Sequence, residues 1–118
     1  MRLYKLAAMK DGWICGDFFP SAFRTSACEV AYRRHPKGQE WPKHMQKQAT
    51  EINLLVSGLM QVEVSTEFGD TVAKTIQPGD IFVIDPNEMA KPTFYEDCIL
   101  VVVKTPSIPG DKIIELCR

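Results

Sequence analysis

Short apolar segments alternate with turns rich in glycine, proline, asparagine and aspartate from Trp13 to Val103. None of these segments keeps the 3.6-residue period of an amphipathic helix, whereas short apolar runs bounded by turn residues are typical of β-strands. The sequence therefore predicts an all-β chain. The expected strands are Gly12–Phe18, Cys28–Arg34, Lys43–Gln46, Ile52–Ser57, Leu59–Ser65, Thr71–Ile76, Ile81–Ile84, Thr93–Tyr95 and Ile99–Lys104.

Three of these strands, Ile52–Ser57, Ile81–Ile84 and Ile99–Lys104, are apolar on both faces. A strand with two apolar faces must be covered on both, which indicates two packed sheets with a partly covered outer face. In a domain of this size a second copy of the chain is the natural cover, so we expect a homodimer. If the strand after Glu51 is regular, Asn53 and Leu55 share its face.

The length of 118 residues predicts one domain spanning residues 1–118. The net charge of −1 comes from interspersed acids and bases, which favours neither nucleic acid nor an anionic membrane as a partner. No apolar run is long enough to cross a bilayer. The 4 cysteines form no Cys-x-x-Cys pair and lie in apolar stretches, which is typical of reduced thiols. We therefore expect a cytoplasmic protein.

The candidate chemistry gathers around one predicted strand, Lys43–Gln46. Residues two apart on a strand point to the same face, so His44 and Gln46 project together. Glu51 opens the next strand and can face the same interior. An imidazole, an amide and a carboxylate that converge in this way suit either a divalent metal or a polar small molecule.

At these positions the chain resembles the cupin superfamily. Its first motif reads His-x-His, three or four residues, Glu, six residues, Gly, and the matching residues here are His44, Gln46, Glu51 and Gly58. The second cupin motif reads Gly, five residues, Pro-x-Gly, two residues, His. Counted from Gly79, these positions hold Asp85, Asn87 and Ala90. Asparagine tolerates the left-handed backbone of a turn glycine, so Asn87 preserves the turn.

The resemblance implies an all-β double-stranded β-helix, the jelly roll of a cupin barrel, over about residues 28–104, flanked by N-terminal and C-terminal arms. In metal-binding cupins it also implies three histidines and one glutamate as ligands. Glutamine stands at the second histidine position and alanine at the third. The metal site, His44, Gln46 and Glu51, is therefore degenerate. We expect either no cofactor or a weakly bound divalent metal.

The leading hypothesis is a barrel that binds a small polar molecule, such as a sugar or another metabolite. The expected ligand-binding residues are His44, Gln46, Glu51, Trp41 and Asn53. One alternative is a metal-dependent cupin enzyme, an oxygenase or a sugar isomerase or epimerase, although the sequence singles out no catalytic residues. Another alternative is a protein interaction module that uses its apolar outer strands.

Overall fold

The fold consists of two facing β-sheets. The computed structural model describes residues 1–115, and Cys117 lies outside them. The elements are the 3-10 helix η1 (Leu6–Ala8) and the strands β1 (Trp13–Gly16), β2 (Phe23–Arg24), β3 (Glu29–His35), β4 (His44–Gln46), β5 (Thr50–Ser57), β6 (Met60–Ser65), β7 (Thr71–Ile76), β8 (Ile81–Ile84), β9 (Met89–Phe94), β10 (Cys98–Thr105) and β11 (Lys112–Ile114).

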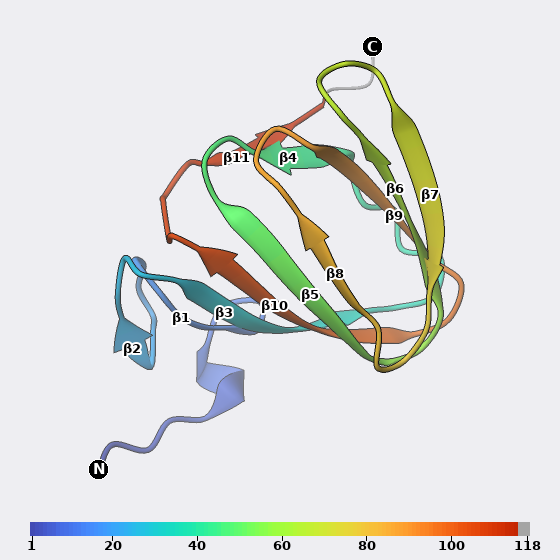
Figure 1. The fold of residues 1–118 in the computed structure, drawn as a ribbon. Helices are drawn as coiled ribbons and strands as arrows, with labels where there is room; N and C mark the ends of the chain where they lie inside the picture. The colour runs from blue at the N-terminus through green and yellow to red at the C-terminus, as the bar shows by residue number, and fades with distance from the viewer. Residues whose placement is uncertain (116–118) are drawn as a thin grey trace.

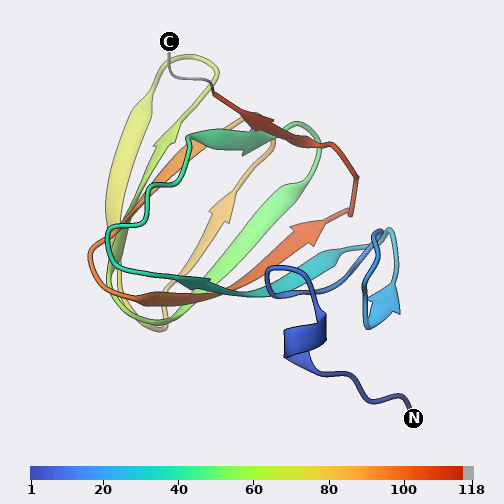
Figure 2. The ribbon, with the colours of Figure 1, turned by 180° about the vertical axis from the view of Figure 1, so that it is seen from behind.

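One sheet has the strand order β2-β1-β3-β10-β5-β8, and the other has the order β11-β4-β9-β6-β7. All strand pairs except β1 with β2 are antiparallel. Figure 1 shows the two sheets enclosing a common interior, with the N-terminal segment extending away from them, and Figure 2 shows the same arrangement from behind. This is the predicted jelly roll. No helix among residues 1–115 is both long enough and apolar enough to span a membrane.

The strand predictions are accurate in the middle of the chain and weaker at its ends. The bounds of β7 and β8 match the prediction, whereas β9 begins earlier than the expected Thr93. The short strands β2 and β11 were not predicted. His35 does not lie in a loop: it ends β3, is 6% exposed and stacks on Phe94 at 4.4 Å between ring centroids. The aromatic partner comes from β9 of the other sheet, a contact that the sequence alone does not reveal.

Alternation along the central strands places the core between the sheets. On β5, Glu51, Asn53 and Leu55 are buried, whereas the residues between them are less so, as the sequence predicts. The same alternation buries Leu100 and Val102 on β10. The apolar core comprises Ala31, Leu55, Met60, Val62, Ile76, Phe94, Cys98, Leu100 and Val102.

Gly58 joins β5 to β6 at a point where no other residue fits. Its φ is +100°, and a Cβ atom there would collide with the carbonyl oxygen of Asp97. The turn therefore needs glycine both for its backbone conformation and for the close approach of the loop before β10. Asn87, which the second motif places in a turn, adopts the expected left-handed conformation with φ +69°.

The C-terminal arm is fastened to the sheet that contains β4. Its last strand, β11, pairs with β4 and brings Lys112 opposite Gln46. The carboxylate of Asp111, 6% exposed, accepts hydrogen bonds from the backbone N–H groups of Gln48 and Ala49 at 3.0 Å. The arm is thus part of the wall around the interior.

Candidate functional site

A cavity of about 300 Å³ lies between the two sheets. Besides His35, which is 6% exposed, four polar residues line it although each is almost fully buried: His44 is 8% exposed, Glu51 8%, Asn53 4% and Lys104 9%. Burial of so many polar groups is costly unless they find partners. Their convergence on one cavity identifies this end of the interior as the candidate site.

Strand register brings these four side chains together. Glu51 on β5 lies opposite Lys104 on β10, and Asn53 lies two residues further along the same face. His44 comes from the other sheet, where it pairs with Ala90 of β9. The cavity therefore has polar groups from both sheets, and Ala90 leaves room beside the imidazole.

The His44 imidazole is held in one tautomer. Its Nδ1–H donates a hydrogen bond to the carbonyl oxygen of Pro42 at 3.1 Å, and because that oxygen can only accept, Nε2 is left as an acceptor. Burial lowers the pKa of His44 below its ordinary value, while the nearby Glu51 carboxylate partly offsets this. His44 is thus a neutral hydrogen-bond acceptor, and potential base, at neutral pH.

Two buried amide groups have no hydrogen-bond partner among the described residues, namely the Nδ2 of Asn53 and the Nε2 of Gln46. An unpaired buried donor costs about 1–3 kcal/mol. Asn53 lines the cavity, so a bound molecule can satisfy its Nδ2. Gln46 is 3% exposed but does not belong to the cavity wall.

The rest of the wall near the polar residues is basic and aromatic. Arg33 lies over both Trp41 and Trp13, with its Cζ 5.3 Å and 6.0 Å from the ring centroids. The Nζ of Lys112 is 5.0 Å from the Trp41 centroid, and that of Lys104 is 4.9 Å from the Trp13 centroid. All five residues line the cavity. Cation–π contacts of this kind hold long basic side chains in place.

Burial changes the pKa of two of these cations, Arg33 and Lys112. Burial lowers the pKa of Arg33, and the Asp11 charge partly restores it. Partial desolvation also lowers the pKa of Lys112, and repulsion from Lys104 adds to this effect. These basic groups therefore sit close enough to repel one another.

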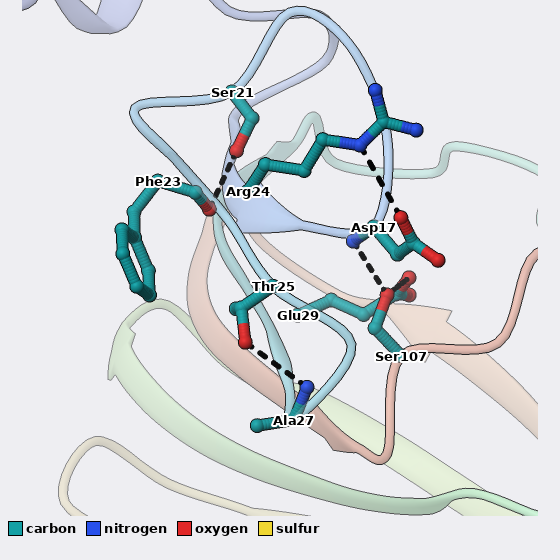
Figure 3. Close-up of polar contacts among 8 residues, drawn as sticks. All are labelled: Asp17, Ser21, Phe23, Arg24, Thr25, Ala27, Glu29 and Ser107. Atoms are coloured by element: carbon teal, nitrogen blue, oxygen red, sulfur yellow. Dashed lines mark hydrogen bonds and ion pairs between the residues drawn. The ribbon is translucent and has the colours of Figure 1, made fainter.

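Lys104 has an acidic partner behind the cavity wall. Its Nζ lies 4.0 Å from Glu29 Oε1, and the hydroxyl of Ser107 donates a hydrogen bond to Glu29 Oε2 at 2.7 Å. Ser107 Oγ also accepts from the backbone N–H of Asp17 at 2.9 Å. Figure 3 shows this network, in which Ser107 of the C-terminal arm links the β1–β2 loop to Glu29. These hydrogen bonds anchor the segment that follows β10, the strand that carries Lys104.

The donor set does not fit a tightly bound transition metal. Across residues 1–115, no three histidine, cysteine, aspartate or glutamate side chains gather in a way that could hold a metal ion. Of the residues expected as ligands, only His44 and Glu51 line the cavity. Lys104, opposite Glu51, adds a positive charge that opposes a second cation.

The sequence-predicted residues divide into two groups. The structure brings His44, Glu51, Asn53 and Trp41 together around the cavity and leaves Gln46 outside its wall. Sequence reasoning missed Trp13, Arg33, Lys104 and Lys112, which also line it. The alternation signal was available for two of them: Lys104 continues the inward phase of Leu100 and Val102, and Arg33 that of Ala31 and His35.

Similarity to known proteins is detectable in structure but not in sequence. No protein-family model and no curated protein matches the chain. An uncharacterised conserved protein with a double-stranded β-helix domain from Klebsiella pneumoniae superposes with a TM-score of 0.67 at 19% identity, covering 79% of this chain and 78% of that one.

Two kinds of named enzyme share the fold. Oxalate decarboxylase from Bacillus subtilis gives a TM-score of 0.69 at 14% identity over 75% of this chain, and a recombinant oxalate oxidase gives 0.66 at 20% over 74%. The chain spans 24% of the decarboxylase and 45% of the oxidase. The chain thus has the double-stranded β-helix fold of cupins.

Proposed function

We propose that this protein binds a small polar molecule in the cavity between its sheets and does so without a tightly held metal ion. The observation that supports this most directly is Asn53, which is 4% exposed, lines a cavity of about 300 Å³ and has no hydrogen-bond partner for its Nδ2 among the described residues. A volume at the lower end of the range for ligand pockets suits a metabolite rather than a larger molecule. A divalent ion held weakly by His44, Glu51 and water is compatible with the same pocket.

Thermal unfolding in the presence of a panel of sugars and organic metabolites tests this proposal. A ligand that binds the folded chain alone raises the melting temperature in a concentration-dependent way. Asn53→Leu should abolish the shift, whereas Gln48→Leu, exposed and outside the cavity wall, should preserve it. Absence of a shift with every compound would contradict the proposal.

A second candidate is an enzyme in which His44 and Glu51 carry out acid–base chemistry. The observation in its favour is the Pro42 hydrogen bond, which leaves the His44 Nε2 unprotonated and, with the imidazole lining the cavity, available to accept a proton. Elemental analysis distinguishes a metal-dependent enzyme from a metal-free one. One metal per chain, lost in His44→Ala, would favour a metal-dependent oxygenase or isomerase; without a metal, only acid–base chemistry on a bound ligand remains.

We also propose a homodimer formed through the outer face of the sheet that contains β5, β8 and β10. Val56 is 44% exposed, Ile81 66% and Val83 53%, so this face carries large apolar side chains. Light scattering should give twice the chain mass, and Val83→Lys should reduce it to one. Phe68→Lys, 85% exposed between β6 and β7 of the other sheet, serves as the control. A monomeric wild type would favour the alternative of an interaction module for a different protein.

A further inference from the structure

Two cations of the cavity wall have no acidic partner at close range. Among the described residues, Lys104 has a carboxylate oxygen at 4.0 Å, whereas no carboxylate lies within that distance of Arg33 or Lys112. Arg33 instead donates to the backbone carbonyl of Asp11 at 2.9 Å, and Lys112 lies over Trp41. Both groups retain N–H donors for an anion.

The charged residues of the cavity wall limit the number of negative charges that this anion can carry. Three cations line the cavity, Arg33, Lys104 and Lys112, together with two carboxylates, Asp11 and Glu51. Lys104 is paired with Glu29, so Arg33 and Lys112 are the cations left to bind an anion. One negative charge can be shared between these two cations, whereas a phosphate dianion would also face the carboxylates of Asp11 and Glu51.

The buried end of the cavity calls for groups that both donate and accept hydrogen bonds. Asn53 Nδ2 lacks an acceptor, and His44 Nε2 and the Glu51 carboxylate can each accept a hydrogen bond from a ligand donor. A hydroxyl group serves both needs, since it carries one donor and two acceptor positions. A purely apolar acid would leave these groups unpaired.

We infer, building on the proposed function, that the ligand is a small hydroxylated organic acid with a single carboxylate. Arg33 and Lys112 bind the carboxylate, and His44, Glu51 and Asn53 bind the hydroxyl groups. Trp13 and Trp41 act through the cations: their rings hold Arg33, Lys104 and Lys112 in position.

Calorimetric titration with matched pairs of acid and neutral compound tests this inference on the full chain. Suitable pairs are glucuronate with glucose and gluconate with glucitol, and inorganic phosphate serves as an anion without the carbon skeleton. We expect each acid to bind at least about tenfold more tightly than its neutral partner, as a charge-assisted hydrogen bond allows. Phosphate should bind more weakly than either acid.

The variants Arg33→Gln and Lys112→Gln should each weaken acid binding by about tenfold and leave the neutral partner unchanged. Arg34→Gln, on the same strand as Arg33, and Lys91→Gln, on β9, remove the same charge outside the cavity wall, so neither should change the binding of the acid or of its neutral partner.

Neutral compounds that bind as tightly as the acids would overturn this inference and leave the proposed function standing. Phosphate that binds as tightly as the acids would also overturn it, because the basic residues would then form a general anion site. If no compound of the panel binds, both the inference and the proposed function fail.

Discussion

The two ends of the space between the sheets differ in chemistry although the same strands build them. On β5 the inward side chains run from Glu51 and Asn53 to Leu55, and on β10 they run from Lys104 to Val102 and Leu100. One end is apolar, with Leu100 and Val102 in the cavity wall and Leu55 packed in the core outside it, and the other end is polar. The change occurs within two residues of one strand.

The apolar end can support the polar one. Leu55, Met60 and Cys98 are at most 1% exposed, and each fully buried aliphatic side chain contributes about 1.5–3 kcal/mol. The polar end holds unpaired donors and closely spaced cations, which lower stability. Buried groups that cost stability without a structural gain are a sign of a functional site, because only a ligand gives them partners.

The largest expected effect on stability concerns Leu55, in the apolar core. Leu55→Ala should lower the free energy of unfolding by about 2–5 kcal/mol, because it leaves a cavity in a close-packed core. Val56→Ala, on the 44% exposed neighbour, should cost less than about 1 kcal/mol. Denaturant unfolding measures both. Similar losses for the two variants would contradict the division of β5 into an inward and an outward face.

The next largest effect concerns the C-terminal arm, which contributes Lys112 to the cavity wall. Asp111→Ala should cost about 2–3 kcal/mol, since two backbone N–H groups lose an ionised acceptor. Asp111→Asn, which keeps one oxygen acceptor, should cost less. Denaturant unfolding again gives the values. A cost below about 0.5 kcal/mol for Asp111→Ala would mean that the arm is not held by this carboxylate.

The fold could be predicted from the sequence because its signals are local. Alternation along β5 and the glycine at position 58 depend on neighbours in the chain, and both predictions are confirmed. The buried position of His35, one residue past the expected strand Cys28–Arg34, was not predicted, since its Phe94 partner comes from a distant strand. The short strand β11 was not predicted because it pairs with β4, which lies far from it in the sequence.

The candidate site could be predicted only in part. The motif spacing pointed to His44 and Glu51, and the strand phase pointed to Asn53. The basic residues of the wall were not predicted, because Arg33 and Lys104 lie on strands whose other residues have an ordinary β-strand pattern. In addition, a lysine at the end of an apolar strand is usually solvated. The placement of Lys112 depends on the folded arm and has no local signal.

A third prediction uses the histidines of the polar end. Burial lowers the folded-state pKa of His35 and of His44 below their ordinary value of 6.5. Below about pH 6.5 the unfolded chain therefore binds more protons than the folded chain, so stability is fully present above this pH and falls on acidification. The slope is at most about 1.4 kcal/mol per pH unit for each histidine.

His35→Phe keeps an aromatic ring against Phe94 and removes one titrating group. Urea unfolding across about pH 5 to 7.5 should show a shallower decline for this variant than for the wild type. The other titrating groups are common to both proteins, so the difference isolates His35. Equal slopes would mean that His35 does not titrate at a lowered pKa in the folded protein.

The smallest expected effect on stability concerns Asn53 and Gln46, whose side-chain amide nitrogens have no hydrogen-bond partner among the described residues. Asn53→Leu and Gln46→Met each replace a buried group without a partner by an apolar one of similar size, so the free energy of unfolding should change by less than about 1 kcal/mol or increase. Their effects on ligand binding should differ, because only Asn53 lines the cavity. Titration with a compound that binds the wild type should show loss of binding in Asn53→Leu and retention in Gln46→Met. Loss in Gln46→Met alone would instead return Gln46 to the binding site that the motif spacing indicates and would remove Asn53 from it.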